Sequence, residues 1–148
     1  MRRFLIITLL ALGLSLAGCA STKATTVKLA VASDAMADGA ADVWTNYVGA
    51  QVSLCRGRDL PTEQARIECM GFAGPDNRAK FEAVLKLLIA TQTAIYIAVN
   101  CEDNPLKLDA SVRGQCVNSY DWGMLREALL DAWTALRPFI LEAKKGAQ

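Results

Sequence analysis

The side chains that could do chemistry in this chain of 148 residues are five cysteines and 15 carboxylates; the chain has no histidine. Histidine is the most common general base and a common zinc ligand, so its absence excludes Ser-His-Asp and Cys-His catalysis and histidine-containing metal sites. Carboxylate pairs such as Glu63 with Glu68, or Asp103 with Asp109, have no distinctive spacing. The sequence also lacks a glycine-rich phosphate loop and a Gly-x-Ser-x-Gly turn. We therefore predict a protein that is not an enzyme, with no catalytic residues, no metal and no cofactor.

The N-terminal residues have the pattern of an export signal. Two arginines precede an apolar run from Phe4 to Leu16, as in a secretory signal peptide. The run has about 13 residues, fewer than the ~20 that a helix needs to cross a bilayer. It ends in Leu16-Ala17-Gly18-Cys19, a tetrad that resembles the lipobox of bacterial lipoproteins. The resemblance implies that a signal peptide of residues 1–18 is removed and that Cys19 becomes a lipidated N-terminus carrying acyl chains such as palmitate.

The same resemblance implies a location and a first partner, the membrane. Cys19 is followed by alanine rather than by the aspartate that retains lipoproteins in the inner membrane. We therefore expect a lipid anchor in the periplasmic leaflet of the outer membrane of a Gram-negative bacterium. Several acyl chains make such an anchor stable rather than transient. The formal net charge of +1 is too small to argue for nucleic acid as a partner.

The rest of the chain shows helical spacing of apolar residues and no convincing alternating strand. Three long helices are expected, from Val27 to Leu54, from Asp76 to Asn100 and from Asp121 to Lys145, with a short helix from Leu60 to Met70. We predict one all-α domain over residues 27–148, a small bundle of three long helices plus one short helix. A polar linker over residues 19–26 is expected to join this domain to the lipid.

The first long helix is expected to have an acidic side and an apolar side. Asp34, Asp38 and Asp42 recur every four residues, and such a row could bind a cation or a partner, or could simply face solvent. The opposite side is expected to face the core; it comprises Met36, Ala40, Val43, Tyr47, Ala50 and Leu54.

The other four cysteines are expected to form disulfides, because an exported protein folds in an oxidising compartment. They are Cys55, Cys69, Cys101 and Cys116, and three pairings are possible. In an up-down-up bundle, the ends of the first two long helices lie ~37 Å apart for ~25 helical residues, whereas bridged Cα atoms lie within ~7 Å. This favours Cys55 with Cys69 and Cys101 with Cys116, two disulfides that brace opposite poles. The alternative, an all-cysteine zinc site, lacks the usual short Cys-x-x-Cys spacings.

The segment from Ala83 to Val99 is more apolar than one buried helix face requires. It could serve membrane insertion or oligomerisation, or it could be a helix covered on two sides in the bundle; Lys86 and Gln92 argue against a membrane span. The extra width leaves room for a groove that a partner helix could fill. The expected partner-binding residues are Leu87, Ile89 and Tyr96.

Two short segments carry a resemblance to a known family. They are Cys55-Arg56-Gly57-Arg58-Asp59-Leu60-Pro61, after the first long helix, and Pro138-Phe139-Ile140 near the C-terminus. Both are similar to segments of the secretin pilotins of type II secretion systems. The resemblance implies a small helical lipoprotein that holds an amphipathic helix of an envelope protein in a groove. Three further cysteines and the long loop from Cys101 to Ser119 depart from the family pattern. We expect a non-catalytic protein-binding or assembly factor with an envelope protein as its partner.

Two other functions remain open at this point. The chain could be a phage- or plasmid-encoded envelope lipoprotein that acts in lysis or exclusion. It could also be a small-molecule carrier with Trp44, Trp122 and Trp133 around a cavity in the bundle, although three tryptophans can equally belong to the core.

A basic cluster near the end of the first long helix also allows two interpretations. The cluster comprises Arg56, Arg58, Arg66, Arg78 and Lys80, with acidic residues interleaved. It could contact anionic lipid headgroups or an acidic partner, or it could form a rigid cap in which salt bridges neutralise the charges.

Overall fold

The computed structural model describes residues 22–104, 108–117 and 119–146, and these residues form helices and no strand. The long helices are α2 (Thr22–Arg56), α4 (Pro75–Asp103) and α6 (Trp122–Lys145). Two short helices, α3 (Glu63–Met70) and η1 (Gly71–Ala73), join α2 to α4, and α5 (Ala110–Arg113) lies in the connection to α6. The predicted all-α bundle of three long helices is confirmed. Apolar spacing gives no sign of η1 and α5, which are too short to show a period.

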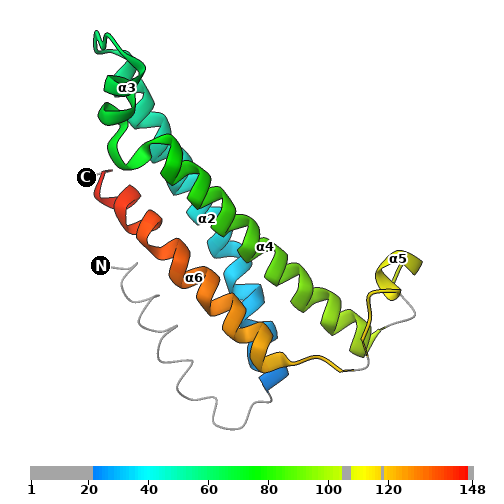
Figure 1. The fold of residues 1–148 in the computed structure, drawn as a ribbon. Helices are drawn as coiled ribbons and strands as arrows, with labels where there is room; N and C mark the ends of the chain where they lie inside the picture. Colours follow the sequence, from blue (N-terminus) through cyan, green and yellow to red (C-terminus); the bar gives the residue numbers. More distant parts are fainter. Residues whose placement is uncertain (1–21, 105–107, 118, 147–148) are drawn as a thin grey trace.

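The three long helices run up, down and up, and each contacts the other two (Figure 1). We call the end where α2 finishes and α4 begins the first pole. The second pole is the opposite end, where α2 and α6 begin and α4 finishes. At the first pole α3 lies along the end of α2, whereas α5 stands clear of the long helices near the second pole (Figure 1). The two connections are therefore packed to different extents.

α2 begins five residues earlier than predicted, so most of the expected polar linker belongs to the bundle. Thr26 is fully buried and its hydroxyl donates to the backbone oxygens of Thr22 (2.8 Å) and Trp122 (3.1 Å). Lys23 pairs with carboxylates at the end of α4. These contacts with α4 and α6 stabilise a helical turn whose threonine-rich sequence predicts a linker. The prediction that the bundle begins at Val27 is therefore wrong, because α2 begins at Thr22.

The core combines small side chains from α2 with larger ones from α4 and α6. The predicted core face of α2 is only partly right, because Ala40 is buried while Met36 and Leu54 are 43% and 60% exposed. The buried face is the one that carries small side chains, which let α4 and α6 approach α2 closely. The main core residues are Ala30, Ala37, Ala40 and Trp44 of α2, Phe81, Leu88 and Ile95 of α4, and Leu129, Leu136 and Phe139 of α6.

An aromatic cluster fills the core toward the first pole. The Trp44 ring stacks on Phe81, with ring centroids 4.8 Å apart, and makes edge-to-face contacts with Phe139 and Phe72, with centroids 5.4 and 6.0 Å apart. Such offset and edge-to-face contacts are the favoured arrangements of aromatic rings. Since Phe139 and Trp44 belong to α6 and α2 and Phe72 to η1, the cluster joins the bundle to the connection at the first pole.

Both predicted disulfides are confirmed. Cys55 is bonded to Cys69 with Cα atoms 5.9 Å apart, and Cys101 is bonded to Cys116 with Cα atoms 5.6 Å apart. The first ties the end of α2 to α3, and the second ties the end of α4 to the segment after α5. The pairing follows from the antiparallel course of α2 and α4, which puts Cys55 and Cys101 at opposite poles.

Candidate functional site: a groove between α2 and α4

The groove lies between antiparallel faces of α2 and α4 and encloses about 330 Å³. Each helix contributes residues three, four or seven apart, a spacing that places them on one face. The lining residues are Asp34, Ala37, Asp38 and Ala41 of α2, and Leu85, Ile89, Gln92, Thr93 and Tyr96 of α4. The groove forms here because alanines on α2 oppose longer side chains on α4.

The structure brings together two of the three predicted partner-binding residues. Ile89, which is 49% exposed, and the half-buried Tyr96 both line the groove. Leu87 does not line it, although it is 56% exposed. Leu87 and Ile89 are two residues apart and therefore lie about 200° apart around the helix. Half-buried Leu85 takes the place of Leu87 in this groove.

A buried hydrogen-bond chain fixes the floor of the groove. The amide Nε2 of Gln92 donates to the hydroxyl of Ser33 at 2.6 Å, and that hydroxyl donates to the backbone oxygen of Ala30 at 2.9 Å. Ser33 is fully buried and Gln92 is 3% exposed. Polar side chains in such surroundings need specific partners, so this chain of bonds specifies one register between α2 and α4. The groove is therefore preformed.

Asp34 and Asp38 give the rim of the groove a negative charge. Both are exposed, and neither makes an ion pair within the described residues. The third aspartate of the row, Asp42, is also exposed but does not line the groove. The acidic row and the apolar residues of α4 are each visible in the sequence, but their juxtaposition depends on the register of the two helices. The site thus presents apolar side chains beside two carboxylates.

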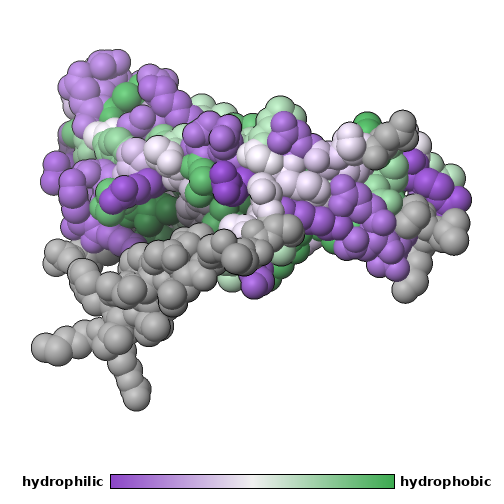
Figure 2. Space-filling model, turned by 90° about the horizontal axis from the view of Figure 1, so that it is seen from below, coloured by the Kyte–Doolittle hydropathy of each residue, from purple (hydrophilic) through white to green (hydrophobic). Residues whose placement is uncertain are grey.

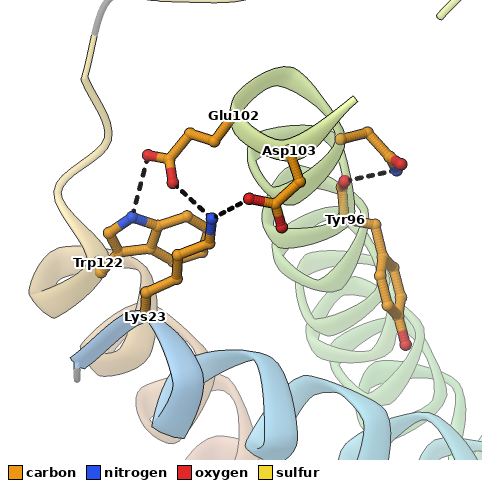
Figure 3. Close-up of polar contacts among 6 residues, drawn as sticks. Lys23, Tyr96, Glu102, Asp103 and Trp122 are labelled. Atoms are coloured by element: carbon orange, nitrogen blue, oxygen red, sulfur yellow. Dashed lines mark hydrogen bonds and ion pairs between the residues drawn. The ribbon is translucent and has the colours of Figure 1, made fainter. Parts of the chain in front are cut away.

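A polar cluster at the second pole holds the ends of all three long helices together (Figure 3). Lys23 Nζ lies 2.8 Å from a Glu102 oxygen, 2.7 Å from an Asp103 oxygen and 5.5 Å from the centre of the Trp122 ring. The Trp122 indole nitrogen donates to Glu102 at 3.2 Å. Hydrogen bonds to Asp103 and to Glu102 raise the pKa of Lys23 above its usual 10.5. Figure 3 shows Tyr96 pointing away from this cluster, so the groove and the cluster are separate features.

A second apolar hollow, of about 340 Å³, lies on the outer side of α6. Its walls include Leu130, which is 45% exposed, and Leu141, which is 48% exposed, beside Arg137. Figure 2 shows how apolar residues, in green, lie in hollows bordered by purple hydrophilic residues on the face seen from below. The hollow also includes Trp133, whose buried indole nitrogen has no hydrogen-bond partner in the described part of the chain. None of the predicted partner-binding residues lines this hollow.

The three tryptophans lie in different parts of the bundle. Trp44 is 5% exposed within the aromatic cluster, Trp122 belongs to the polar cluster at the second pole, and Trp133 lines the hollow on α6. Within residues 22–104, 108–117 and 119–146, the tryptophans therefore do not meet around one cavity. For Trp44, the structure favours a core role over ligand binding.

The described residues offer no grouping of three or more histidine, cysteine, aspartate or glutamate side chains suited to a metal ion. All four cysteines among them are disulfide-bonded. The predicted lipidation residue, Cys19, lies outside the described residues.

One stretch among the described residues, Glu63–Asp103, is long and apolar enough by length and composition to cross a membrane. Its apolar part, α4, contacts both α2 and α6 and buries Phe81, Leu88 and Ile95. A core helix of a bundle can meet the same criterion, but only 22% of the apolar stretch is buried. The buried residues form one stripe along α4, so the helix is not covered on two sides.

The fold and groove define a small disulfide-braced three-helix bundle with a preformed apolar groove and an acidic rim. No protein-family model, curated protein or solved structure matches the chain.

Proposed function

We propose that this protein is a non-catalytic lipoprotein of the outer membrane, anchored at Cys19 on the periplasmic face, that binds a helix of an envelope protein in the α2/α4 groove. The role is similar to that of a pilotin, which holds a segment of its partner during assembly. The single observation that carries the proposal is the groove itself, in which Leu85, Ile89 and Tyr96 of α4 line one side and Asp34 and Asp38 of α2 line the other.

The dimensions of the groove suit one face of an amphipathic helix. Leu85, Ile89 and Tyr96 follow α4 over 11 residue steps, which corresponds to about 16 Å or three helical turns. An amphipathic helix presents anchors at i, i+3 or i+4 and i+7 over about 10 Å, which fits within this length. The expected partner helix therefore inserts two or three apolar side chains between α2 and α4.

The rim predicts the charge of the partner. Asp34 and Asp38 are exposed carboxylates one helical turn apart, and they have no basic neighbour paired with them among the described residues. Complementary charge at a rim contributes mainly to the association rate and to orientation. A helix with lysine or arginine beside its apolar face is therefore the best match.

Binding can be tested by copurification from envelope extracts with the full mature lipoprotein as bait. Ile89→Glu places a charge in the groove and should abolish recovery of the partner, whereas Leu87→Glu places the same charge on an exposed position outside it. Asp34→Lys with Asp38→Lys should weaken recovery, whereas Asp42→Lys should not. Equal recovery with Ile89→Glu and Leu87→Glu would remove the groove from the proposal.

The anchor is tested separately by metabolic labelling with palmitate. The lipobox resemblance predicts that a Cys19→Ala variant loses the label and leaves the outer-membrane fraction. Label that persists in this variant would refute the anchor while leaving the groove untouched.

The alternative of an envelope lipoprotein that acts in lysis or exclusion uses the same anchor, and the genes beside its own would distinguish it. The small-molecule alternative draws less support, because Trp44 is held in the core by ring contacts on several sides.

A further inference from the structure

An arginine-lined pocket lies at the first pole, away from the groove. It encloses about 510 Å³ between the end of α2, the turn that follows it, α3 and the start of α4. Its charged lining residues are Arg56, Arg58, Asp59, Glu63, Arg66 and Arg78, and its apolar ones are Val52, Leu60 and Met70 beside Cys55. Four guanidinium groups and two carboxylates leave the pocket with an excess of positive charge.

Most of this positive charge is not neutralised within the described residues. The single ion pair between lining residues joins Arg66 to Glu63 at 3.5 Å, and both side chains are more than 60% exposed. Arg56 and Arg58 are exposed and make no ion pair in the part of the chain that is described. Of the two interpretations of the basic cluster, a rigid salt-bridged cap is therefore the less consistent with the structure. The guanidinium groups of Arg56 and Arg58 therefore remain available to bind an anion.

The pocket has a fixed frame. The Cys55–Cys69 disulfide joins α2 to α3, and the Thr62 hydroxyl caps α3 by accepting from the Ala65 amide at 3.1 Å. Arg78 reaches back from α4 and donates through Nε to the Ala73 backbone oxygen at 2.8 Å. These contacts hold the walls in place before any ligand arrives, which lowers the entropy cost of binding.

We propose that this pocket binds an acidic segment of a polypeptide, through carboxylates that pair with Arg56 and Arg58. A planar guanidinium fork matches a carboxylate in two parallel hydrogen bonds. Asp59 and Glu63 repel densely charged anions, so separated carboxylates on a peptide fit better than a cluster of phosphates. Val52, Leu60 and Met70 also line the pocket, so the segment is expected to carry an apolar side chain between its carboxylates.

The position of the pocket also favours a polypeptide over the headgroups of the anchoring membrane. α2 begins at the second pole, three positions after Cys19 in the sequence, and Arg56 is the last of its 35 residues. A helix of this length spans about 52 Å. The pocket can thus lie well outside the leaflet that holds the anchor, an argument that rests on the proposed lipidation of Cys19.

The proposal can be tested with the full mature chain in non-ionic detergent and a fluorescein-labelled hexapeptide of alternating glutamate and alanine. Fluorescence anisotropy should show saturable binding that weakens with salt, and no binding of the glutamine counterpart. Arg56→Gln with Arg58→Gln should weaken binding about tenfold, because each exposed charge pair contributes modestly. The matched control, Arg137→Gln with Lys144→Gln, removes the same charge from α6 and should change binding less than twofold.

Three results would overturn the proposal. The glutamine peptide could bind as well as the glutamate peptide, or both double variants could weaken binding equally, which would indicate only net charge. Phosphatidylglycerol in mixed detergent micelles, or inorganic phosphate, could displace the labelled peptide at a lower concentration than the unlabelled glutamate peptide does, which would make the ligand a lipid headgroup or free phosphate instead. Since Ile89 is not part of this pocket, failure here leaves the groove proposal intact.

Discussion

Removal of the Cys55–Cys69 disulfide should destabilise the protein by about 3 kcal/mol. The bond closes a loop with a sequence separation of 14, and the chain-entropy relation gives ~3 kcal/mol for a loop of this size. In the folded protein the loop stays ordered without the bond, because α3 and η1 contact α2 and the Thr62 cap holds α3. The loss of stability therefore arises almost entirely because the unfolded chain gains conformational entropy. The test uses the double variant Cys55→Ala with Cys69→Ala. Alanine is preferred to serine because a serine hydroxyl would be buried at position 55.

The second disulfide provides a matched control. Cys101–Cys116 closes a loop of nearly equal size, with a sequence separation of 15, so the relation predicts the same ~3 kcal/mol. However, α5 has no buried residue and stands clear of the long helices (Figure 1). Without the bond this connection also gains freedom in the folded state, which offsets part of the entropy gained by the unfolded chain. We expect Cys101→Ala with Cys116→Ala to cost less than half as much.

The free energies of unfolding of the parent and of both double variants are compared by urea titration under non-reducing conditions, with unfolding monitored by circular dichroism. A loss of 3 kcal/mol corresponds to a fall in Tm of about 10 °C for a domain of this size. Equal losses for the two variants would refute the argument that packing of the connection decides the effect. A loss below about 1 kcal/mol for the first-pole variant would refute the entropic estimate itself.

Three further changes have defined outcomes. Leu88→Ala should lower the free energy of unfolding by about 2–5 kcal/mol because Leu88 is fully buried, whereas the exposed Leu87→Ala should change it by less than ~0.5 kcal/mol in the same urea titration. Gly71 has φ of 50°, which side chains disfavour, so Gly71→Ala should cost ~1–3 kcal/mol in thermal melts. The hydrogen bonds to Asp103 and Glu102 that raise the Lys23 pKa, and the burial that raises the Tyr47 pKa, both favour the protonated folded form. The contribution of these two groups to stability should therefore be fully present below pH 10 and be lost as the pH rises above it, and Lys23→Gln should flatten part of that decline. Retained stability in Leu88→Ala, tolerance of Gly71→Ala, or an unchanged alkaline decline in Lys23→Gln would contradict the respective argument.

Long-range features of the fold follow from the sequence where one strong constraint acts. Helix lengths set the distance between the poles, and that distance selects Cys55 with Cys69 and Cys101 with Cys116. Helix ends are predictable where capping or breaking residues mark them: the Asp121 side chain accepts from the Met124 amide at the start of α6, and Gly71 ends α3. The predicted start of the short helix at Leu60 is wrong, because α3 begins at Glu63 after the Thr62 cap.

Other features depend on packing that spacing does not encode. α2 carries apolar residues on more than one side. The side with the small Ala37 packs in the core, whereas the side with the larger Met36 is exposed. The first turn of α2 is helical because Lys23 and Thr26 find partners on α4 and α6. Tertiary contacts between helices determine which side of α2 is buried and where α2 begins, so helical periodicity alone does not predict either feature.

The candidate site shows the same division. Apolar width on α4 indicates that a surface is available, and Ile89 and Tyr96 do line the groove. Helical spacing places Ile89 and Tyr96 on one face and Leu87 on another, but it does not say which of these two apolar faces borders the groove. The contribution of Asp34 and Asp38 requires the register between α2 and α4, which the buried bond from Gln92 to Ser33 sets.

Photo-cross-linking in living cells tests the central claim, partner binding in the α2/α4 groove, most directly. A photoreactive phenylalanine analogue is placed at Ile89 or, as the matched control, at Leu87, both exposed on α4 but on different sides. The account predicts one discrete adduct from Ile89, formed with an envelope protein through an amphipathic helix that carries basic residues. The yield of this adduct should fall with Asp34→Lys and Asp38→Lys. The same adduct from Leu87, or no discrete adduct from Ile89, would contradict it.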